Sequence, residues 1–357
     1  MADDKTKTWK VPVLSKRRSR PRDENLWLFH KDKFKNFMKK CEGKKLVIAL
    51  SGGKLKFACH LPILRLIESL EIQLDEVWGS SAGAVVGGLW SNGMTVRELD
   101  KILDDVNVTM IYDFLNIQAI KTAIEAHKQA QPLRTAGIFP GIRIEKYLRT
   151  LLTESKKETP LMDISRFYSM TYNISRFYRT ALRMTRDSRV HHINFMNYEI
   201  LNEKVTDGDL ADIIRASIAM AGIYWPEEIG GELFLDGGMA EQLPIRSPFV
   251  TWQHDIRNGK EKRDLFIVGM ELVYATSDAP PPANPLSMIS ESFELMGDEI
   301  ARDHQYCIAT HDSDDGPKVE LIVIQPKVPY TILTEVPNFA RQMEITKDAI
   351  VKVLSDK

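Results

Sequence analysis

The stretch Asp75-Glu76-Val77-Trp78-Gly79-Ser80-Ser81-Ala82-Gly83-Ala84-Val85-Val86 decides the fold of this chain. The short run over 75–78 predicts a buried strand, and the small apolar residues over 82–90 predict a helix. A serine between two glycines at a strand-to-helix turn is typical of a nucleophile elbow, which lifts Ser81 clear of the sheet. Gly79 and Gly83 are expected because the turn is strained and packs closely. The helix N-terminus then favours negative charge at Ser81.

The pattern around this stretch repeats strand, loop and helix. Residues 46–50 form a continuous apolar run, as expected of a strand buried on both faces. The loop Ser51-Gly52-Gly53 and a helical pattern over 58–70 follow it. Further elements predicted from their apolar patterns are helices within 95–155 and over 142–152, 209–220 and 338–354, and strands within 166–200 and over 265–269 and 319–324. This order predicts a three-layer α/β/α fold with a mainly parallel central sheet and Ser81 at its carboxyl edge.

Composition is that of an ordinary globular protein. The chain has 357 residues, of which 43% are hydrophobic and 27% charged, and a formal net charge of -1. The near-zero charge argues against a dedicated nucleic-acid binder. We expect no membrane span and no signal peptide, and the three cysteines favour a reducing compartment, so a cytoplasmic protein is predicted. The simplest division is a basic extension over residues 1–45 and one catalytic domain over residues 46–357.

The N-terminal extension is strongly basic. Residues 1–45 contain fifteen Lys or Arg and six Asp or Glu, and residues 16–22 are the densest run. This run is either an arm that binds anionic lipid or a solvated tail. Trp27, His30, Phe34 and Phe37 then recur at steps of three and four, which predicts a short amphipathic helix docked on the domain. Trp27 and Phe34 are also candidates for insertion at a membrane surface.

Two further blocks accompany the elbow. The first is the glycine loop, and the second combines a helix, a proline loop and an Asp-Gly-Gly turn. They read Leu50-Ser51-Gly52-Gly53-Lys54-Leu55-Lys56, and Arg215-Ala216-Ser217-Ile218-Ala219-Met220-Ala221-Gly222-Ile223-Tyr224-Trp225-Pro226 followed by Leu235-Asp236-Gly237-Gly238 and Leu243-Pro244. In this order and together with the elbow, they make the chain resemble the patatin-like phospholipase family over about residues 46–355.

The resemblance implies a Ser–Asp dyad without a catalytic histidine. Ser81 is then the nucleophile and Asp236 its proton acceptor, and the backbone N–H groups of Gly52, Gly53 and Lys54 form the oxyanion hole. Gly237 and Gly238 permit the close approach of Asp236. The implied activity is hydrolysis of fatty-acyl esters through an acyl-enzyme intermediate, with a phospholipid or other acyl lipid as substrate, peripheral contact with a membrane, and no metal or cofactor.

The glycine loop departs from the family pattern. The family has a third glycine where this chain has Lys54, an arginine where it has Lys56, and a glycine where it has Phe57. If the third position needs a positive φ, lysine there costs on the order of 1 kcal/mol. Lys56 keeps the charge of the arginine but loses its bidentate geometry.

Other interpretations of the same residues stay open. Ser81 as an ordinary helix N-cap and Asp236 as a plain turn residue are both possible in isolation. His60 is interpreted as structural, and the adjacent His191 and His192 point to opposite faces of a strand, which does not favour metal binding. Residues 312–316 lack the full calcium-loop pattern, and Gly52-Gly53-Lys54 lacks that of a P-loop. An acyltransferase and a catalytically impaired lipid-binding protein remain alternative functions.

Overall fold

The computed structural model describes residues 24–104, 106, 137–154, 163–274, 285–311, 316–329 and 337–356. The elements within them, in chain order, are η1 (Glu24–Trp27), η2 (Lys31–Phe34), α1 (Lys35–Cys41), β1 (Lys45–Leu50), η3 (Lys54–His60), α2 (Leu61–Leu70), β2 (Glu76–Ser80), α3 (Ala82–Ser91), α4 (Val96–Ile102), β3 (Gly137–Phe139), α7 (Ile142–Glu154), η5 (Ile164–Arg166), β4 (Phe167–Asn173), β5 (Tyr178–Met184), β6 (Val190–Met196), β7 (Glu199–Thr206), α8 (Leu210–Ser217), β8 (Gly222–Tyr224), β9 (Glu227–Ile229), β10 (Glu232–Asp236), α9 (Gly238–Glu241), α10 (Arg246–Arg257), β11 (Leu265–Met270), β12 (Val273–Tyr274), α11 (Pro285–Ala309), β13 (Val319–Ile324), β14 (Lys327–Val328) and α12 (Phe339–Leu354).

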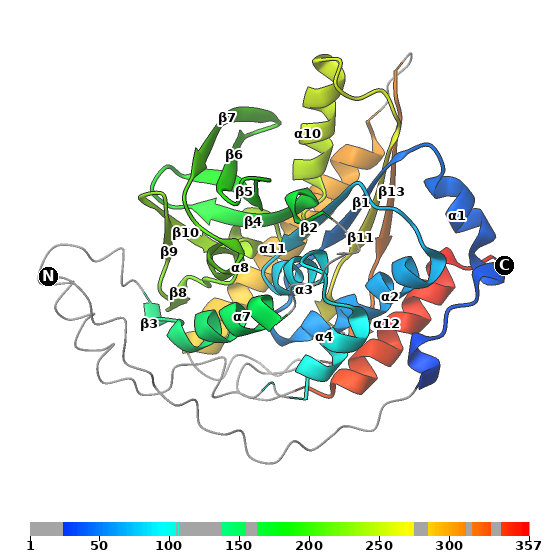
Figure 1. The fold of residues 1–357 in the computed structure, drawn as a ribbon, viewed down its shortest axis with the longest axis horizontal. Helices are drawn as coiled ribbons and strands as arrows, with labels where there is room; N and C mark the ends of the chain where they lie inside the picture. The colour runs from blue at the N-terminus through cyan, green and yellow to red at the C-terminus, as the bar shows by residue number, and fades with distance from the viewer. Residues whose placement is uncertain are drawn as a thin grey trace, which may run out of the picture.

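A mixed sheet forms the centre of the molecule (Figure 1). In the described part of the chain its order is β13-β11-β1-β2-β4-β5-β6-β7, and β10 joins β4 to β9. Strands β13, β11, β1, β2 and β4 run parallel, whereas β5, β6 and β7 continue the sheet as antiparallel strands. Leu50 pairs with Gly79, so the glycine loop and the elbow leave the sheet side by side at its carboxyl edge.

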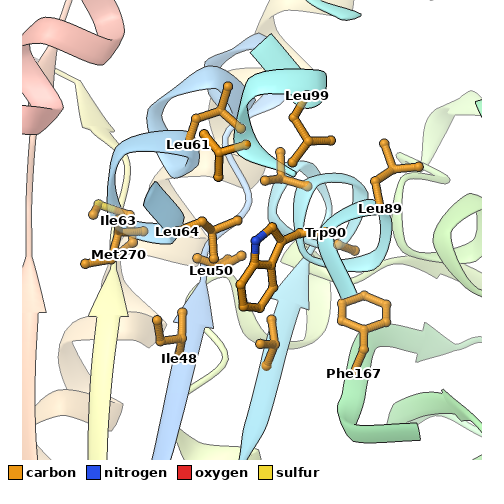
Figure 2. Close-up of a cluster of buried hydrophobic side chains, with 14 of the residues drawn as sticks. Ile48, Leu50, Leu61, Ile63, Leu64, Leu89, Trp90, Leu99, Phe167 and Met270 are labelled. Carbon is orange, nitrogen blue, oxygen red and sulfur yellow. The ribbon is translucent and has the colours of Figure 1, made fainter. Parts of the chain in front are cut away.

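Helices cover both faces of this sheet, which confirms the predicted three-layer α/β/α fold. Leu46, Ile48 and Leu50 of β1 point into one hydrophobic cluster, with side chains of α2, α3, α4, α7, α8 and α12. Figure 2 shows part of this cluster, in which Leu61 and Leu64 of α2 and Trp90 of α3 lie over the strands that carry Ile48, Leu50 and Met270. Val47 and Ala49 point the other way, into a second cluster with residues of α10 and α11. The alternation follows from the period of two along a strand.

The N-terminal segment packs onto the domain, as the aromatic spacing predicts, but as two short 3-10 turns and α1 rather than one helix. Trp27, Phe34 and Phe37 are buried, and the ring of Phe37 lies 6.2 Å from that of Phe266, while His30 is exposed. Trp27 and Phe34 therefore belong to the core, and the hypothesis that they insert into a membrane is wrong. The basic run 16–22 lies outside the described residues, and the division of the chain at residue 45 stays a prediction.

The predicted helices are confirmed where the structure describes them. Thr95 and Glu98 form a reciprocal capping box at the start of α4, and Asn338 caps α12. The long helix α11 was not predicted. Residues 312–315, part of the suspected calcium loop, lie outside the described residues. In the described part of the chain, no helix is both long enough and apolar enough to span a bilayer.

Candidate active site

The elbow holds Ser81 in a strained backbone conformation. Its φ of 48° and ψ of -113° are rarely adopted by residues other than glycine. A Cβ atom at Gly79 would lie 2.6 Å from the carbonyl oxygen of Gly83, and one at Gly83 would lie 2.1 Å from that of Leu50. Both contacts are too short for any side chain, so the two glycines let the turn close and bring α3 directly behind the serine.

The structure brings Ser81 and Asp236 together. Asp236 ends β10, which pairs with β4, the neighbour of β2 in the sheet. The Ser81 hydroxyl donates a hydrogen bond of 2.8 Å to Oδ2 of Asp236, and the backbone N–H of Gly238 donates one of 2.7 Å to Oδ1. A Cβ atom at Gly237 would lie 2.2 Å from the carbonyl oxygen of Met170. The glycine pair thus allows the close approach that holds the carboxylate.

Asp236 has the electrostatic environment of a proton acceptor. Its side chain is buried, and desolvation raises its pKa from 3.8 to about 6, although the bonds from Gly238 and Ser81 act in the opposite direction. A carboxylate of this pKa is mostly ionised at neutral pH and is more basic than an ordinary aspartate. The arrangement therefore suits removal of a proton from Ser81.

Ser80 and Ser81 are adjacent but differ in what they face. Ser81 is 8% exposed and lines two cavities, whereas Ser80 is fully buried and its hydroxyl has no hydrogen-bond partner among the described residues. A hydroxyl that reaches a cavity is accessible to a substrate, and one that is closed off is not. The geometry thus favours Ser81 over Ser80 as the reactive serine.

The glycine loop lies beside the elbow and departs from the expected donor set. The Gly52 N–H donates a 2.9 Å bond to the carbonyl of Gln242, which is at odds with its predicted role in the oxyanion hole. Lys54 adopts a φ of 52°, so the positive φ considered from the sequence is present and lysine carries its cost of about 1 kcal/mol. Lys56 is buried and its ammonium donates to the carbonyl of Leu272, which ties the loop to the chain after β11.

His60 supports the loop without touching the dyad. Its Nε2 lies 2.9 Å from the carbonyl oxygen of Ser51, which also accepts the N–H of Gly83. Complete burial lowers the pKa of His60 to about 4, so the ring is neutral at neutral pH and donates to this carbonyl. The histidine therefore fastens the glycine loop to the elbow, in agreement with its structural interpretation.

Two positioning residues at the site were not identified from the sequence. The hydroxyl of Ser217, at the end of α8, accepts the Ser81 N–H at 2.9 Å and donates to the carbonyl of Met170 at 2.6 Å. The Gln242 side chain fills the space beside Gly52 and Gly238, where a Cβ atom would lie 2.5 and 2.4 Å from its Oε1. Ser217 stands in a block quoted for the family resemblance, but its contact with an elbow 136 residues away leaves no signal in one sequence.

Two cavities meet at the dyad. The larger has a volume of about 150 Å³ and is lined mainly by apolar side chains of α3, α4, α7 and the segment after α8. The smaller, of about 30 Å³, is lined by the glycine loop, the Asp-Gly-Gly turn, Met239 and Phe293 of α11. Lys54, Ser81, Met220 and Asp236 line both. The junction of an apolar cavity with a more polar one suits a ligand that has an apolar part and a polar part.

The two adjacent histidines lie apart from this site. His191 pairs with Glu203 at 2.9 Å, whereas His192 Nε2 lies 2.7 Å from the Thr206 hydroxyl. They have separate partners, as strand alternation predicts. Among the described residues, no three His, Cys, Asp or Glu side chains are grouped so that they hold a metal ion.

Residues 48–249 match the model of the patatin-like phospholipase family. This match covers more than half of the chain and contains the glycine loop, the elbow and the Asp-Gly-Gly turn. The chain therefore belongs to the patatin-like phospholipase family.

Curated relatives share the family at low identity. Lysophospholipase NTE1 of Saccharomyces cerevisiae is 23% identical over 224 residues, which are 60% of this chain and 11% of that protein. Neuropathy target esterase sws of Drosophila persimilis is 22% identical over 204 residues, which are 57% of this chain and 11% of that protein. The chain thus spans about a tenth of the length of the curated relatives that it matches.

Two solved structures with low structural similarity are VipD and ExoU. The alignment with VipD from Legionella pneumophila has a TM-score of 0.41 at 15% identity, and it covers 87% of this chain and 67% of the VipD chain. The alignment with the type III effector protein ExoU has a TM-score of 0.39 at 13% identity, and it covers 87% of this chain and 53% of the ExoU chain.

Proposed function

We propose that the protein is a lipid acyl hydrolase that cleaves fatty-acyl esters of phospholipids or lysophospholipids. The observation that carries the proposal is the 2.8 Å hydrogen bond from Ser81 to a buried carboxylate at the mouth of an apolar cavity. Family membership and the lysophospholipase relatives support the substrate class. A fatty-acyl chain bound in the apolar cavity places the ester carbonyl beside Ser81.

The proposed reaction begins with proton transfer. Asp236 accepts the proton of the Ser81 hydroxyl while Oγ attacks the ester carbon, and it returns the proton to the alcohol that leaves. Water then attacks the acyl-serine, again with Asp236 as the base. The carbonyl oxygen gains negative charge in both steps, and we assign its stabilisation to the backbone N–H groups of Gly53 and Lys54 with the N-terminus of α3. Loss of one such donor typically costs about 3 kcal/mol.

Release of free fatty acid tests this function. The purified protein is incubated with a panel of phospholipids and lysophospholipids, and Ser81→Ala serves as the inactive control. The proposal expects fatty acid from at least one lipid with the wild type and none with the variant. Transfer of the acyl group to an added alcohol without net hydrolysis indicates an acyltransferase. Lipid binding without turnover or covalent labelling of Ser81 indicates an impaired binding protein.

We also propose peripheral contact with the membrane through α11. Its residues Met288, Leu295 and Met296 are 61%, 64% and 58% exposed and recur at a spacing that places them on one face. Phe293 of the same helix lines the smaller cavity, so α11 flanks the site. Insertion of three apolar side chains at the lipid interface brings the cavities to the substrate. The basic run 16–22 is a second predicted contact.

Vesicle binding separates these two contacts. Leu295→Asp with Met296→Asp is expected to weaken co-sedimentation with neutral vesicles, and Val353→Asp on α12, which is also exposed, serves as the matched control. Deletion of residues 1–22 is expected to weaken binding only to anionic vesicles and only at low salt. Equal binding of all variants contradicts the proposed membrane contact.

A further inference from the structure

Lys54 carries a positive charge into the site from a strained position. Its φ of 52° is unfavourable for an L-amino acid, and its side chain is nearly buried. Lys54 is one of the residues that line both cavities at the junction where Ser81 and Asp236 lie. Strain that persists at a functional site points to a role for the residue that carries it.

We propose that Lys54 forms a subsite for a phosphoryl group near the scissile ester, and that Glu291 of α11 occupies this subsite when no substrate is bound. The inference rests on the proposed hydrolase function and names its substrate class. The preferred substrates are acylglycerols that carry a phosphate monoester, rather than neutral acylglycerols.

The two cavities hold opposite sides of the bound ester. The larger cavity takes the acyl chain because its walls are apolar, so the alcohol side of the ester faces the smaller cavity. Among the described residues that line either cavity, Lys54 is the only cation. Lys56 lines neither, and its ammonium is engaged by the carbonyl of Leu272. A phosphate on the alcohol side therefore meets Lys54.

The partner of Lys54 is suited to exchange with a ligand. The Lys54 ammonium lies 3.1 Å from Oε1 of Glu291, whose side chain is 27% exposed. Solvent screening weakens an ion pair whose carboxylate is partly exposed. A phosphate monoester carries about -1.5 to -2 charge at neutral pH, against -1 for a carboxylate. A bound phosphate thus displaces Glu291 with a net gain in electrostatic energy, whereas a neutral acylglycerol leaves the ion pair intact.

The ratio of kcat/KM for two matched esters tests the subsite. The substrates are octanoylglycerol 3-phosphate and octanoylglycerol, which share an acyl chain and differ by the phosphate. Lys54→Met keeps an unbranched side chain at the same φ and removes the charge, and Lys54→Arg restores the charge. Lys31→Met is the control, because Lys31 forms an exposed ion pair with Glu71 on the surface.

The expected result is a ratio that follows the charge at residue 54. Lys54→Met lowers the phosphorylated-to-neutral ratio about tenfold or more, as for loss of a charge-assisted hydrogen bond, while Lys54→Arg and Lys31→Met stay within about threefold of the wild type. Glu291→Gln raises the phosphorylated-to-neutral ratio above that of the wild type.

Two other outcomes overturn the inference in distinguishable ways. An active wild type whose ratio is unchanged by Lys54→Met shows that the Lys54–Glu291 pair only holds α11 in place, and this contradicts the subsite alone. A wild type that hydrolyses neither ester and is not labelled at Ser81 by a fluorophosphonate contradicts the hydrolase function, and the subsite falls with it.

Discussion

Two buried carboxylates at the two ends of α9 differ in what surrounds them. Asp236 precedes the helix and accepts hydrogen bonds from the Ser81 hydroxyl and the Gly238 N–H. Glu241 ends the helix and accepts from the Ser247 hydroxyl at 2.5 Å and the Ser247 N–H at 3.1 Å. Each carboxylate thus accepts from a serine hydroxyl and from backbone N–H, yet of the two only Asp236 lines the cavities at the dyad.

The difference lies in the cations and the solvent access. Glu241 also accepts the N–H of Arg246 and lies 3.5 Å from the guanidinium of Arg179, which is itself nearly buried. Asp236 has no ion-pair partner in the described part of the structure, and burial raises its pKa to about 6. A buried carboxylate that is fully paired stabilises the fold, whereas one with few donors and an open cavity is available for proton transfer.

The largest expected effect separates the two carboxylates by turnover. Asp236→Asn keeps the shape of the side chain and removes the base, so we expect kcat to fall about a thousandfold. Glu241→Gln leaves the dyad intact, and the fraction that is folded is expected to keep turnover near that of the wild type. Steady-state hydrolysis of a soluble ester measures both. Comparable losses of kcat in the two folded variants contradict the distinction.

The second expected effect is on stability, and here the change at Glu241 has the larger effect. Glu241→Gln leaves the buried charge of Arg179 without its counterion, so we expect the free energy of unfolding to fall by about 3 kcal/mol. Denaturant unfolding of the wild type and the variant at pH 7 measures this value. A change below 1 kcal/mol means that Glu241 is not the structural counterpart described above.

The ionisation of Asp236 makes the stability of the fold depend on pH, with an effect of similar size. Its pKa in the folded state, about 6, lies above the ordinary 3.8, so the folded state favours the protonated form. The stability that the protonated form contributes is fully present below pH 4 and is lost as the pH rises through 6. It amounts to about 3 kcal/mol for two pKa units. Asp236→Asn is therefore expected to be more stable than the wild type at pH 8. A clear loss of stability in this variant contradicts the raised pKa.

Activity has the opposite pH dependence, because the ionised carboxylate is the base. We expect kcat/KM to rise with pH, tenfold per unit below about pH 6, and to level off above it. A soluble ester with a pH-insensitive leaving group is the suitable substrate. A profile that levels off only near pH 8 assigns the base to another group.

The smallest effect concerns the serine that bonds to Glu241. Ser247→Ala removes one hydroxyl donor of the structural network, and we expect a loss of about 1 kcal/mol in stability with unchanged turnover. The matched change is Ser81→Ala, which removes the hydroxyl that donates to Asp236. It is expected to abolish turnover instead. Thermal unfolding and ester hydrolysis on both variants make the comparison. Loss of turnover in Ser247→Ala shows that the network around Glu241 also positions the dyad.

Much of the fold was accessible from the sequence because its signals are local. The parallel strands β1 and β11 contain continuous apolar runs, and the elbow after β2 is a short motif with fixed geometry. The Ser81–Asp236 contact was expected through the family resemblance, since 155 residues separate the two in the chain. The apolar spacing around Trp27 predicted packing, but it did not distinguish contact with the core from contact with a membrane.

The rest of the site depends on contacts that one sequence does not encode visibly. The bond from Gly52 to Gln242 joins two loops, and the pair of Lys54 with Glu291 spans 237 residues. Helix α11 has an exposed apolar face, which blurs the periodicity from which a docked helix is recognised. Glu241 lies five residues after Asp236 in the chain, and only the three-dimensional surroundings separate their roles.

Mapping of covalent modification tests the central claim most directly. The wild type, Ser80→Ala and Ser81→Ala are treated with a fluorophosphonate, and the modified peptide is identified by mass spectrometry. The account predicts one adduct, on Ser81, in the wild type and in Ser80→Ala, and none in folded Ser81→Ala. An adduct on Ser80, or one that persists in Ser81→Ala, contradicts the assignment of Ser81 as the nucleophile.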